Sequence, residues 1–139
     1  MSAAVRDVMT KNPVTCDVTT SVTETARLMR VHDIGDVLVL EGQTLRGIAT
    51  DRDIVVRCLG AGADVSTSMI GDVCSAIAAT IRVDASVDEA AQTMRDGAVR
   101  RLPVVDGDAV VGIVSLGDLA VEADPGSVLA DISAAEPTS

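Results

Sequence analysis

The chain has 139 residues, of which 47% are hydrophobic and none is aromatic, which is enough apolar material for one domain or two small ones. Twenty-one acidic against 11 basic residues give a formal net charge of −10, which argues against a nucleic-acid backbone or an anionic membrane as the main partner. The lack of aromatic residues excludes stacking platforms for bases and aromatic cages for cations. No apolar stretch approaches the roughly 20 residues of a membrane helix, and the first residues are too charged for a signal peptide, so we expect a soluble cytoplasmic protein.

An internal repeat organises the chain. An ungapped offset of 65 residues, position 72 against position 7, aligns two copies of one unit. Matches recur along the whole copy, from Asp7 against Asp72 to Asp53 against Asp118. Chance does not give that density of identities, so we predict one supersecondary unit that occurs twice.

Each copy is predicted to contain the same five elements in the same order. A short strand leads into a helix that opens with Ser-x-x-Glu, at Ser21 and at Ser86, which is typical of a capping box. A β-hairpin with a glycine in its turn follows, and then a second helix. In chain order the expected elements are strand 14–16, a helix from 21, strands 37–40 and 45–49, helix 51–59, strand 80–83, a helix from 86, strands 102–105 and 110–114, and helix 116–123.

The fold class that follows is mixed α/β (α+β), with two β-α-β-β-α repeats. One unit of about 55 residues without aromatic side chains or disulfides buries too little surface to be stable alone. We therefore expect the repeats to pack sheet to sheet with pseudo-twofold symmetry. The expected division is repeat 1 over 5–60, a crossover linker over 61–69, repeat 2 over 70–123, and a short helix with a loose tail over 124–139.

The cysteines and the histidine form no recognisable metal or catalytic motif. Cys16, Cys58 and Cys74 include no close pair, and His32 is the only histidine. A zinc site usually takes four ligands with at least one close pair, so we expect no metal. These residues also give no nucleophile–base pair, so we expect no catalytic residue and no enzyme. Reduced thiols are expected, and their redox role is left open.

The junction between the second hairpin strand and the second helix carries the candidate ligand site. Both copies have Gly-x-x-[Thr/Ser]-x-x-Asp there, with Thr50 and Asp53 in one copy and Ser115 and Asp118 in the other. A helix N-terminus attracts anions, a hydroxyl at the cap can donate to a phosphate, and a carboxylate one turn later can accept from ribose hydroxyls. The same pattern is also a capping box. Because Asp is shorter than Glu and suits the reach-back bond less well, its recurrence favours the ligand role.

Several segments together carry a family resemblance: Val5-Arg-Asp-Val-Met-Thr10, His32-Asp-Ile-Gly35, Gly47-Ile-Ala-Thr-Asp-Arg-Asp-Ile54, Arg100-Arg-Leu-Pro-Val-Val-Asp-Gly107 and Gly112-Ile-Val-Ser-Leu-Gly-Asp-Leu119. The chain resembles the CBS-domain family, and specifically a tandem CBS pair, or Bateman module. The resemblance covers essentially residues 5 to 122. It implies a stand-alone bacterial CBS-pair protein of the stress-associated kind.

The resemblance also implies a ligand and the residues that hold it. Clefts between the repeats would bind an adenosyl ligand such as AMP, ATP, NAD or S-adenosylmethionine, with no required cofactor. Thr50 and Ser115 would contact phosphate, and Asp53 and Asp118 the ribose. The residues implied near the base are Thr15, Cys16, Val37, Thr80, Ile81, Leu102 and Pro103, and the candidate cations for the phosphate are Arg52 and Arg101.

Differences between the copies predict that the two sites are not equivalent. Arg52 in the first copy is matched by Gly117 in the second. Leu38 stands where the second copy has Pro103, so the usual proline is missing once. Whether both sites are occupied is left open.

The sequence favours a regulatory sensor that signals through conformational or oligomeric change, read by an unknown protein target. The alternative is a structural or protein–protein interaction module without a ligand, and an enzyme is the least favoured. We also expect a homodimer, because the amphipathic helices of one pair are not all covered by their own sheets. The candidate contact residues are Met29, Met94, Val56 and Val121.

Overall fold

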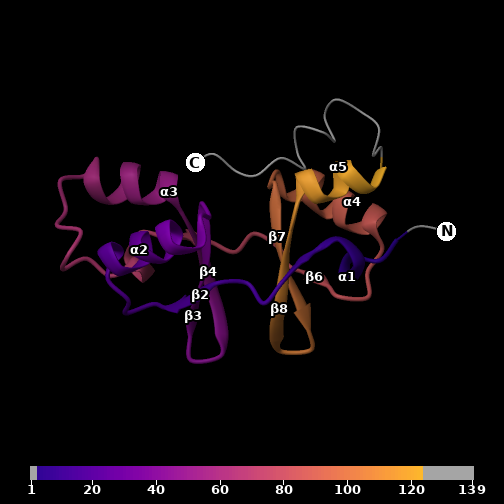
Figure 1. Ribbon diagram of the computed structural model, residues 1–139, viewed down its shortest axis with the longest axis horizontal. Helices are drawn as coiled ribbons and strands as arrows, with labels where there is room; N and C mark the ends of the chain where they lie inside the picture. Colours follow the sequence, from indigo (N-terminus) through magenta and orange to yellow (C-terminus); the bar gives the residue numbers. More distant parts are fainter. Residues whose placement is uncertain (1–2, 124–139) are drawn as a thin grey trace. The chain divides into compact units, whose positions relative to one another are not determined.

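The computed structural model describes residues 3–123, which form two compact units (Figure 1). The first, the continuous unit, is Val14–Ile77. The second, the split unit, combines residues 3–13 with residues 78–123. The short helix and tail expected over 124–139 lie outside the described residues.

The continuous unit contains one four-stranded sheet in the order β2-β3-β4-β5. The β2–β3 pair is parallel, and β3 and β4 form the antiparallel hairpin that the sequence predicts, with β5 on its far edge. Its elements are β2 (Thr15–Asp17), α2 (Val22–His32), β3 (Asp36–Glu41), β4 (Thr44–Thr50), α3 (Asp51–Asp53), a π-helix η1 (Ile54–Leu59), a 3-10 helix η2 (Ile70–Asp72) and β5 (Ser75–Ala76).

The split unit repeats this arrangement with the order β1-β8-β7-β6. Here the β6–β7 pair is parallel and β7 and β8 form the hairpin. The elements are α1 (Val5–Val8), β1 (Thr10–Lys11), β6 (Ile81–Arg82), α4 (Val87–Gly97), β7 (Arg101–Asp106), β8 (Ala109–Ser115) and α5 (Leu116–Ala123). The mixed α/β class with two β-α-β-β-α repeats is thus confirmed, whereas sheet-to-sheet packing stays a prediction.

Local sequence explains the matching geometry of the two units. Ser21 and Ser86 cap the helices that follow them, each accepting from a backbone N–H three residues on. Both helices end in a left-handed residue, Asp33 at φ 54° and Ala98 at φ 53°, which stand 65 positions apart. Each hairpin also has a β-bulge at the matched place, between residues 39 and 40 and between residues 104 and 105. The offset found in the sequence therefore holds for the backbone conformation.

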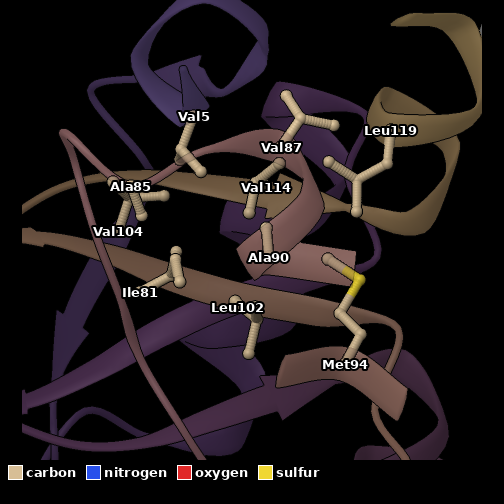
Figure 2. Packing of buried hydrophobic residues seen from close by; sticks show 10 residues of the cluster. All are labelled: Val5, Ile81, Ala85, Val87, Ala90, Met94, Leu102, Val104, Val114 and Leu119. Atoms are coloured by element: carbon tan, nitrogen blue, oxygen red, sulfur yellow. The ribbon is translucent and has the colours of Figure 1, made fainter. Parts of the chain in front are cut away.

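Each unit has its own aliphatic core, and Figure 2 shows that of the split unit. Met94 of α4 packs there and is 3% exposed, and Met29 of α2 occupies the matching place in the continuous unit at 7%. The expectation that these methionines lie on an exposed helix face is therefore wrong. Because the chain has no aromatic side chains, the long and flexible methionine side chain fills the space between helix and sheet in each unit.

The edge strand of each sheet comes from the first residues of the other repeat. β1 pairs with β8, and β5 pairs with β4. These edge segments approach so closely that only glycine fits opposite them. A Cβ on Gly47 would lie 2.6 Å from the carbonyl oxygen of Ser75, and one on Gly112 would lie 2.8 Å from that of Thr10. The repeats of the sequence and the compact units in space thus follow different boundaries.

The close approach at Gly47 predicts opposite effects for the same substitution at two glycines. Gly47→Ala should reduce the free energy of unfolding by about 1–3 kcal/mol, because its Cβ meets backbone that cannot move easily. Gly97→Ala, at the exposed end of α4, meets only Val99 Cγ2 at 3.6 Å and should be neutral or raise it by up to about 1 kcal/mol. Urea denaturation compares the two, and equal effects would contradict the steric account.

Candidate functional site

Both candidate sites lie where a hairpin strand passes directly into a helix. In the continuous unit the Thr50 hydroxyl accepts from the Asp53 N–H at 3.0 Å, and Asp53 Oδ2 accepts from the Thr50 N–H at 3.0 Å. Ser115 and Asp118 form the same reciprocal pair in the split unit, at 3.2 and 2.8 Å. Each pair is a complete capping box, which satisfies backbone groups at the start of the helix.

This geometry corrects the argument drawn from the length of the aspartate side chain. Asp53 and Asp118 do reach back to the backbone, so the shorter side chain suits the bond well. At the Ser-x-x-Glu helices the serine hydroxyl accepts from the backbone N–H of the glutamate three residues on. The Glu24 carboxylate pairs with Arg27. The recurrence of Asp is therefore explained by capping, and it does not by itself indicate a ligand.

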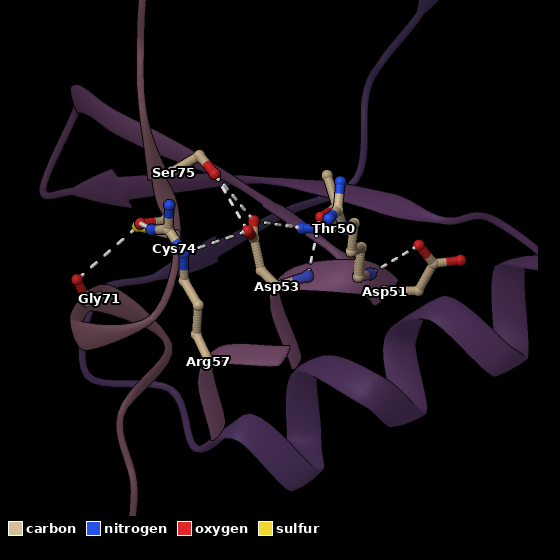
Figure 3. A network of polar contacts seen from close by, with 8 residues as sticks. Thr50, Asp51, Asp53, Arg57, Gly71, Cys74 and Ser75 are labelled. Atoms are coloured by element: carbon tan, nitrogen blue, oxygen red, sulfur yellow. Dashed lines mark hydrogen bonds and ion pairs between the residues drawn. The ribbon is translucent and has the colours of Figure 1, made fainter. Parts of the chain in front are cut away.

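The Asp53 carboxylate has further partners from two other elements (Figure 3). The Ser75 hydroxyl, on β5, donates toward Oδ1 at 3.0 Å and Oδ2 at 3.2 Å. Arg57 of η1 places its Nε 3.7 Å from Oδ1 and donates from Nη1 to the carbonyl of Cys74 at 3.3 Å. Asp53 is only 8% exposed. Hydrogen bonds and a nearby guanidinium thus stabilise the negative charge of Asp53, as a buried carboxylate requires.

The Asp118 carboxylate has a more open environment. Asp118 is half-buried. Within residues 3–123 its carboxylate accepts one hydrogen bond, the capping bond from the Ser115 N–H. The residue that matches Ser75 is Thr10, which pairs with Ile113 as Ser75 pairs with Ile48 and is exposed. The residue that matches Arg57 in the sequence is Glu122. The two junctions therefore share a cap and differ in what surrounds the carboxylate.

Each unit brings its own share of the expected site residues to one sheet. Asp36 lies directly across the hairpin from Thr50, and Arg101 lies directly across from Ser115. The charge beside the cap hydroxyl is thus negative in one unit and positive in the other. Arg52 is exposed and follows directly after Asp51, at the start of α3.

The residues expected to hold the base divide between core and surface. The side chains of Val37, Ile81 and Leu102 belong to the buried cores, so only their backbone groups are available to a ligand. Pro103 is also buried, whereas Thr15 of β2 and Thr80, just before β6, are exposed.

All three cysteines are free and belong to the continuous unit. Burial raises the pKa of the Cys16 thiol and, together with the nearby Asp53 charge, that of Cys74. Cys58 is fully buried and donates weakly to the carbonyl of Ala63. A raised pKa reduces the thiolate fraction at neutral pH, so Cys16 and Cys74 are poor nucleophiles.

Sequence reasoning missed Ser75 and Arg57 as neighbours of Asp53. The i,i+4 spacing of Asp53 and Arg57 on a predicted helix was a usable signal. The sequence held no such signal for Ser75, because Ser75 lies on β5, which follows the linker and pairs with β4 of the preceding repeat.

Neither a metal cluster nor a membrane span is found in the part of the chain that the structure describes. Over residues 3–123 no three His, Cys, Asp or Glu side chains gather as they would around an ion. Within the same residues no helix has the length and apolar character needed to cross a bilayer.

Two β-α-β-β-α repeats with capped strand–helix junctions define the class of protein. The sequence matches the CBS domain twice, over residues 5–60 and 70–123. The chain therefore belongs to the CBS-domain family and carries a tandem pair of these domains. It is 38% identical over 135 residues to the CBS domain-containing protein YhcV of Bacillus subtilis, covering 94% of this chain and 96% of that protein. It is also 34% identical to hypoxic response protein 1 of Mycobacterium tuberculosis, over 83% of this chain and 81% of the relative.

Solved structures share the fold. The crystal structure of hypoxic response protein I with two coordinated zinc ions has a TM-score of 0.76 at 34% identity, covering 85% of this chain and 97% of that one. The CBS domain pair of protein MJ0100, in complex with 5′-methylthioadenosine and S-adenosylmethionine, has a TM-score of 0.79 at 26% identity, covering 91% and 100%. These similarities confirm the expected fold class and the tandem CBS pair.

The two junctions predict different stability effects for one substitution in ligand-free protein. Asp118→Ala should lower the free energy of unfolding by about 1 kcal/mol, the cost of a lost cap. Asp53→Ala removes the same cap and also leaves the half-buried Ser75 hydroxyl without its partner, so we expect a loss of about 2–3 kcal/mol. Urea denaturation measures both, and equal losses would show that the Ser75 and Arg57 contacts contribute nothing.

Proposed function

We propose that this CBS pair is a non-enzymatic sensor that binds an adenosyl ligand at its strand–helix junctions. The observation that carries the proposal is the matched hydroxyl and carboxylate of Thr50 with Asp53 and of Ser115 with Asp118. A hydroxyl at the cap can donate to a phosphate oxygen while it accepts from the backbone. A carboxylate one turn later has remaining lone pairs for ribose hydroxyls. Backbone groups would hold the base, near Thr15, Cys16 and Val37 in the continuous unit and near Thr80, Ile81, Leu102 and Pro103 in the split unit.

The relatives support this ligand class. The MJ0100 pair, which aligns with 91% of this chain, holds 5′-methylthioadenosine and S-adenosylmethionine. Both are adenosyl compounds without phosphate. The sensor role, the cytoplasmic location and the stress association are parts of the same proposal, and the relative called hypoxic response protein 1 supports the last of them.

Charge favours ligands with few phosphates. A net charge of −10 opposes a polyphosphate such as ATP, so AMP or the cationic S-adenosylmethionine suits the protein better. Arg101 stands across from Ser115, which favours a single phosphate there. Asp36 stands across from Thr50, which disfavours one, although Arg52 lies on the adjoining turn.

One observation favours the second candidate, an interaction module that binds no nucleotide. The carboxylates of Asp53 and Asp118 both accept capping hydrogen bonds, and Asp53 is largely buried. Under this hypothesis the protein would act through its surface alone. The two candidates differ in a single measurable property, which is adenosyl binding.

Calorimetric titration with AMP, ATP, S-adenosylmethionine and 5′-methylthioadenosine tests the sensor proposal. We expect at least one of them to bind, and Asp118→Ala to weaken that binding by about 1.5–3 kcal/mol, or roughly ten- to a hundredfold. With no Trp, Tyr or Phe in the chain, adenine carried through purification should dominate the near-ultraviolet absorbance. Flat titrations together with no such absorbance would overturn the sensor and support the interaction module.

A homodimer through helices is also part of the proposal. With Met29 and Met94 buried, the exposed apolar residues of the continuous unit's helices are Val31, Val55, Val56 and Leu59, at 71%, 57%, 54% and 57%. Three of these lie on η1, and Val121, the match of Val56, is half-buried. Leaving them in water costs the hydrophobic free energy that a second copy would recover.

Val56→Glu should convert the dimer to a monomer, because it places a charge within the apolar face. Sedimentation equilibrium at micromolar concentration measures the mass. Thr44→Glu, at the exposed hairpin end of β4, is the control and should leave the dimer intact. A wild-type mass equal to one chain would contradict the dimer, and a dimeric Val56→Glu protein would exclude η1 as its interface.

A further inference from the structure

Both oxygens of the Asp53 carboxylate already face donors within the protein. The Thr50 N–H donates to Oδ2 at 3.0 Å, and the single Ser75 hydroxyl proton is shared between Oδ1 at 3.0 Å and Oδ2 at 3.2 Å (Figure 3). The Arg57 Nε lies 3.7 Å from Oδ1. A ribose edge brings two hydroxyl donors of its own. These would compete with Ser75 and Arg57 for the same two oxygens.

The two groups that occupy Asp53 are themselves held in position. Ser75 is fixed on β5, where it pairs with Ile48 of β4 and where its carbonyl lies against Gly47. Arg57 donates to the carbonyl of Cys74, one residue before Ser75. Thus Arg57 ties η1 to the same edge segment that supplies the hydroxyl. The contacts form one connected network and not two independent ones.

The split unit lacks both parts of this network. Thr10 takes the place of Ser75, and no hydrogen bond from Thr10 to Asp118 is recorded among the described residues. In the sequence the position that matches Arg57 holds a glutamate, Glu122, and so has no guanidinium. Asp118 therefore keeps one carboxylate oxygen beyond its capping bond for a ligand.

We propose, on the basis of the adenosyl-binding function proposed above, that Ser75 and Arg57 act as a latch that keeps the Asp53 junction closed to ribose. The Asp118 junction, which has no latch, binds an adenosyl ligand first. Binding at Asp53 requires the Ser75 hydroxyl to exchange for a ribose hydroxyl and Arg57 to move away from Oδ1. Ser75 and Arg57 are thus specificity-determining residues that set the order in which the two junctions fill.

Equilibrium dialysis of the full chain with labelled AMP and, separately, labelled S-adenosylmethionine tests the latch. We expect wild-type protein to bind one molecule per chain, and Asp118→Ala to weaken that binding roughly ten- to a hundredfold. Ser75→Ala should add a second site, with the affinity at Asp53 raised by about tenfold or more, the scale of one hydrogen bond to a charged group. Asp53→Ala in the Ser75→Ala background should remove this second site again.

Thr10→Ala is the matched control, because it makes the same kind of change at the equivalent edge position of the other sheet. It should leave the number of bound molecules unchanged. Arg57→Gln is a second latch variant that leaves β5 intact, and it should raise the affinity at Asp53 in the same direction as Ser75→Ala. If Ser75→Ala does not fold, Arg57→Gln decides the question.

The outcomes separate the latch from the function on which it rests. Two equal sites in wild-type protein, or no gain at Asp53 in the folded latch variants, would overturn the latch and leave adenosyl binding intact. No binding of either probe by wild-type protein and by both latch variants would overturn both. A second site that appears only in the latch variants and depends on Asp53 would confirm the latch.

Discussion

The contact on which both units depend is the approach of an edge segment to a glycine in the hairpin's second strand. At Gly47 and Gly112 a side chain would collide with backbone and sulfur atoms of that segment, at 2.6 to 2.8 Å. The missing Cβ lets β5 and β1 reach hydrogen-bonding distance of the hairpins and complete two four-stranded sheets. Because β4 and β8 run straight into α3 and α5, the same strands also fix where the capped junctions begin. Steric freedom at two positions thus sets the sheets and, through them, the candidate sites.

Identical caps produce two different carboxylates because the edge segments differ in sequence. Serine on one edge turns a capping aspartate into the centre of a polar network, whereas threonine at the matched position is exposed. The arginine four residues after Asp53 is also matched in the sequence by a glutamate four residues after Asp118. Repetition of a fold therefore preserves backbone geometry and leaves the electrostatics of each copy free to diverge.

Much of the fold could be predicted from the sequence, since the 65-residue offset and the Ser-x-x-Glu caps report on local structure. The hairpins, their glycine turns and the paired helices all follow from contacts between residues close in the chain. The apolar spacing of each first helix also predicts a buried stripe that includes Met29 and Met94, and the structure confirms their burial. Their assignment to the dimer contact was wrong, because the same side chains cannot also face a second copy. The capping bonds of Thr50 with Asp53 and of Ser115 with Asp118 were also predictable, but the contact between Asp53 and Ser75 was not. That depends on edge strands that come from distant segments, which no local pattern reveals.

The split unit has a consequence for how the protein folds during its synthesis. The continuous unit, Val14–Ile77, is complete as soon as β5 has left the ribosome, and all its strand pairs are then available. Residues 3–13 emerge earlier, yet their partner strand β8 is about a hundred residues further along the chain. Val5 of α1 is fully buried in the finished structure, in a core whose other members all follow the continuous unit in the chain. Residues 3–13 are therefore made before the continuous unit, yet their strand pairing is completed only after it.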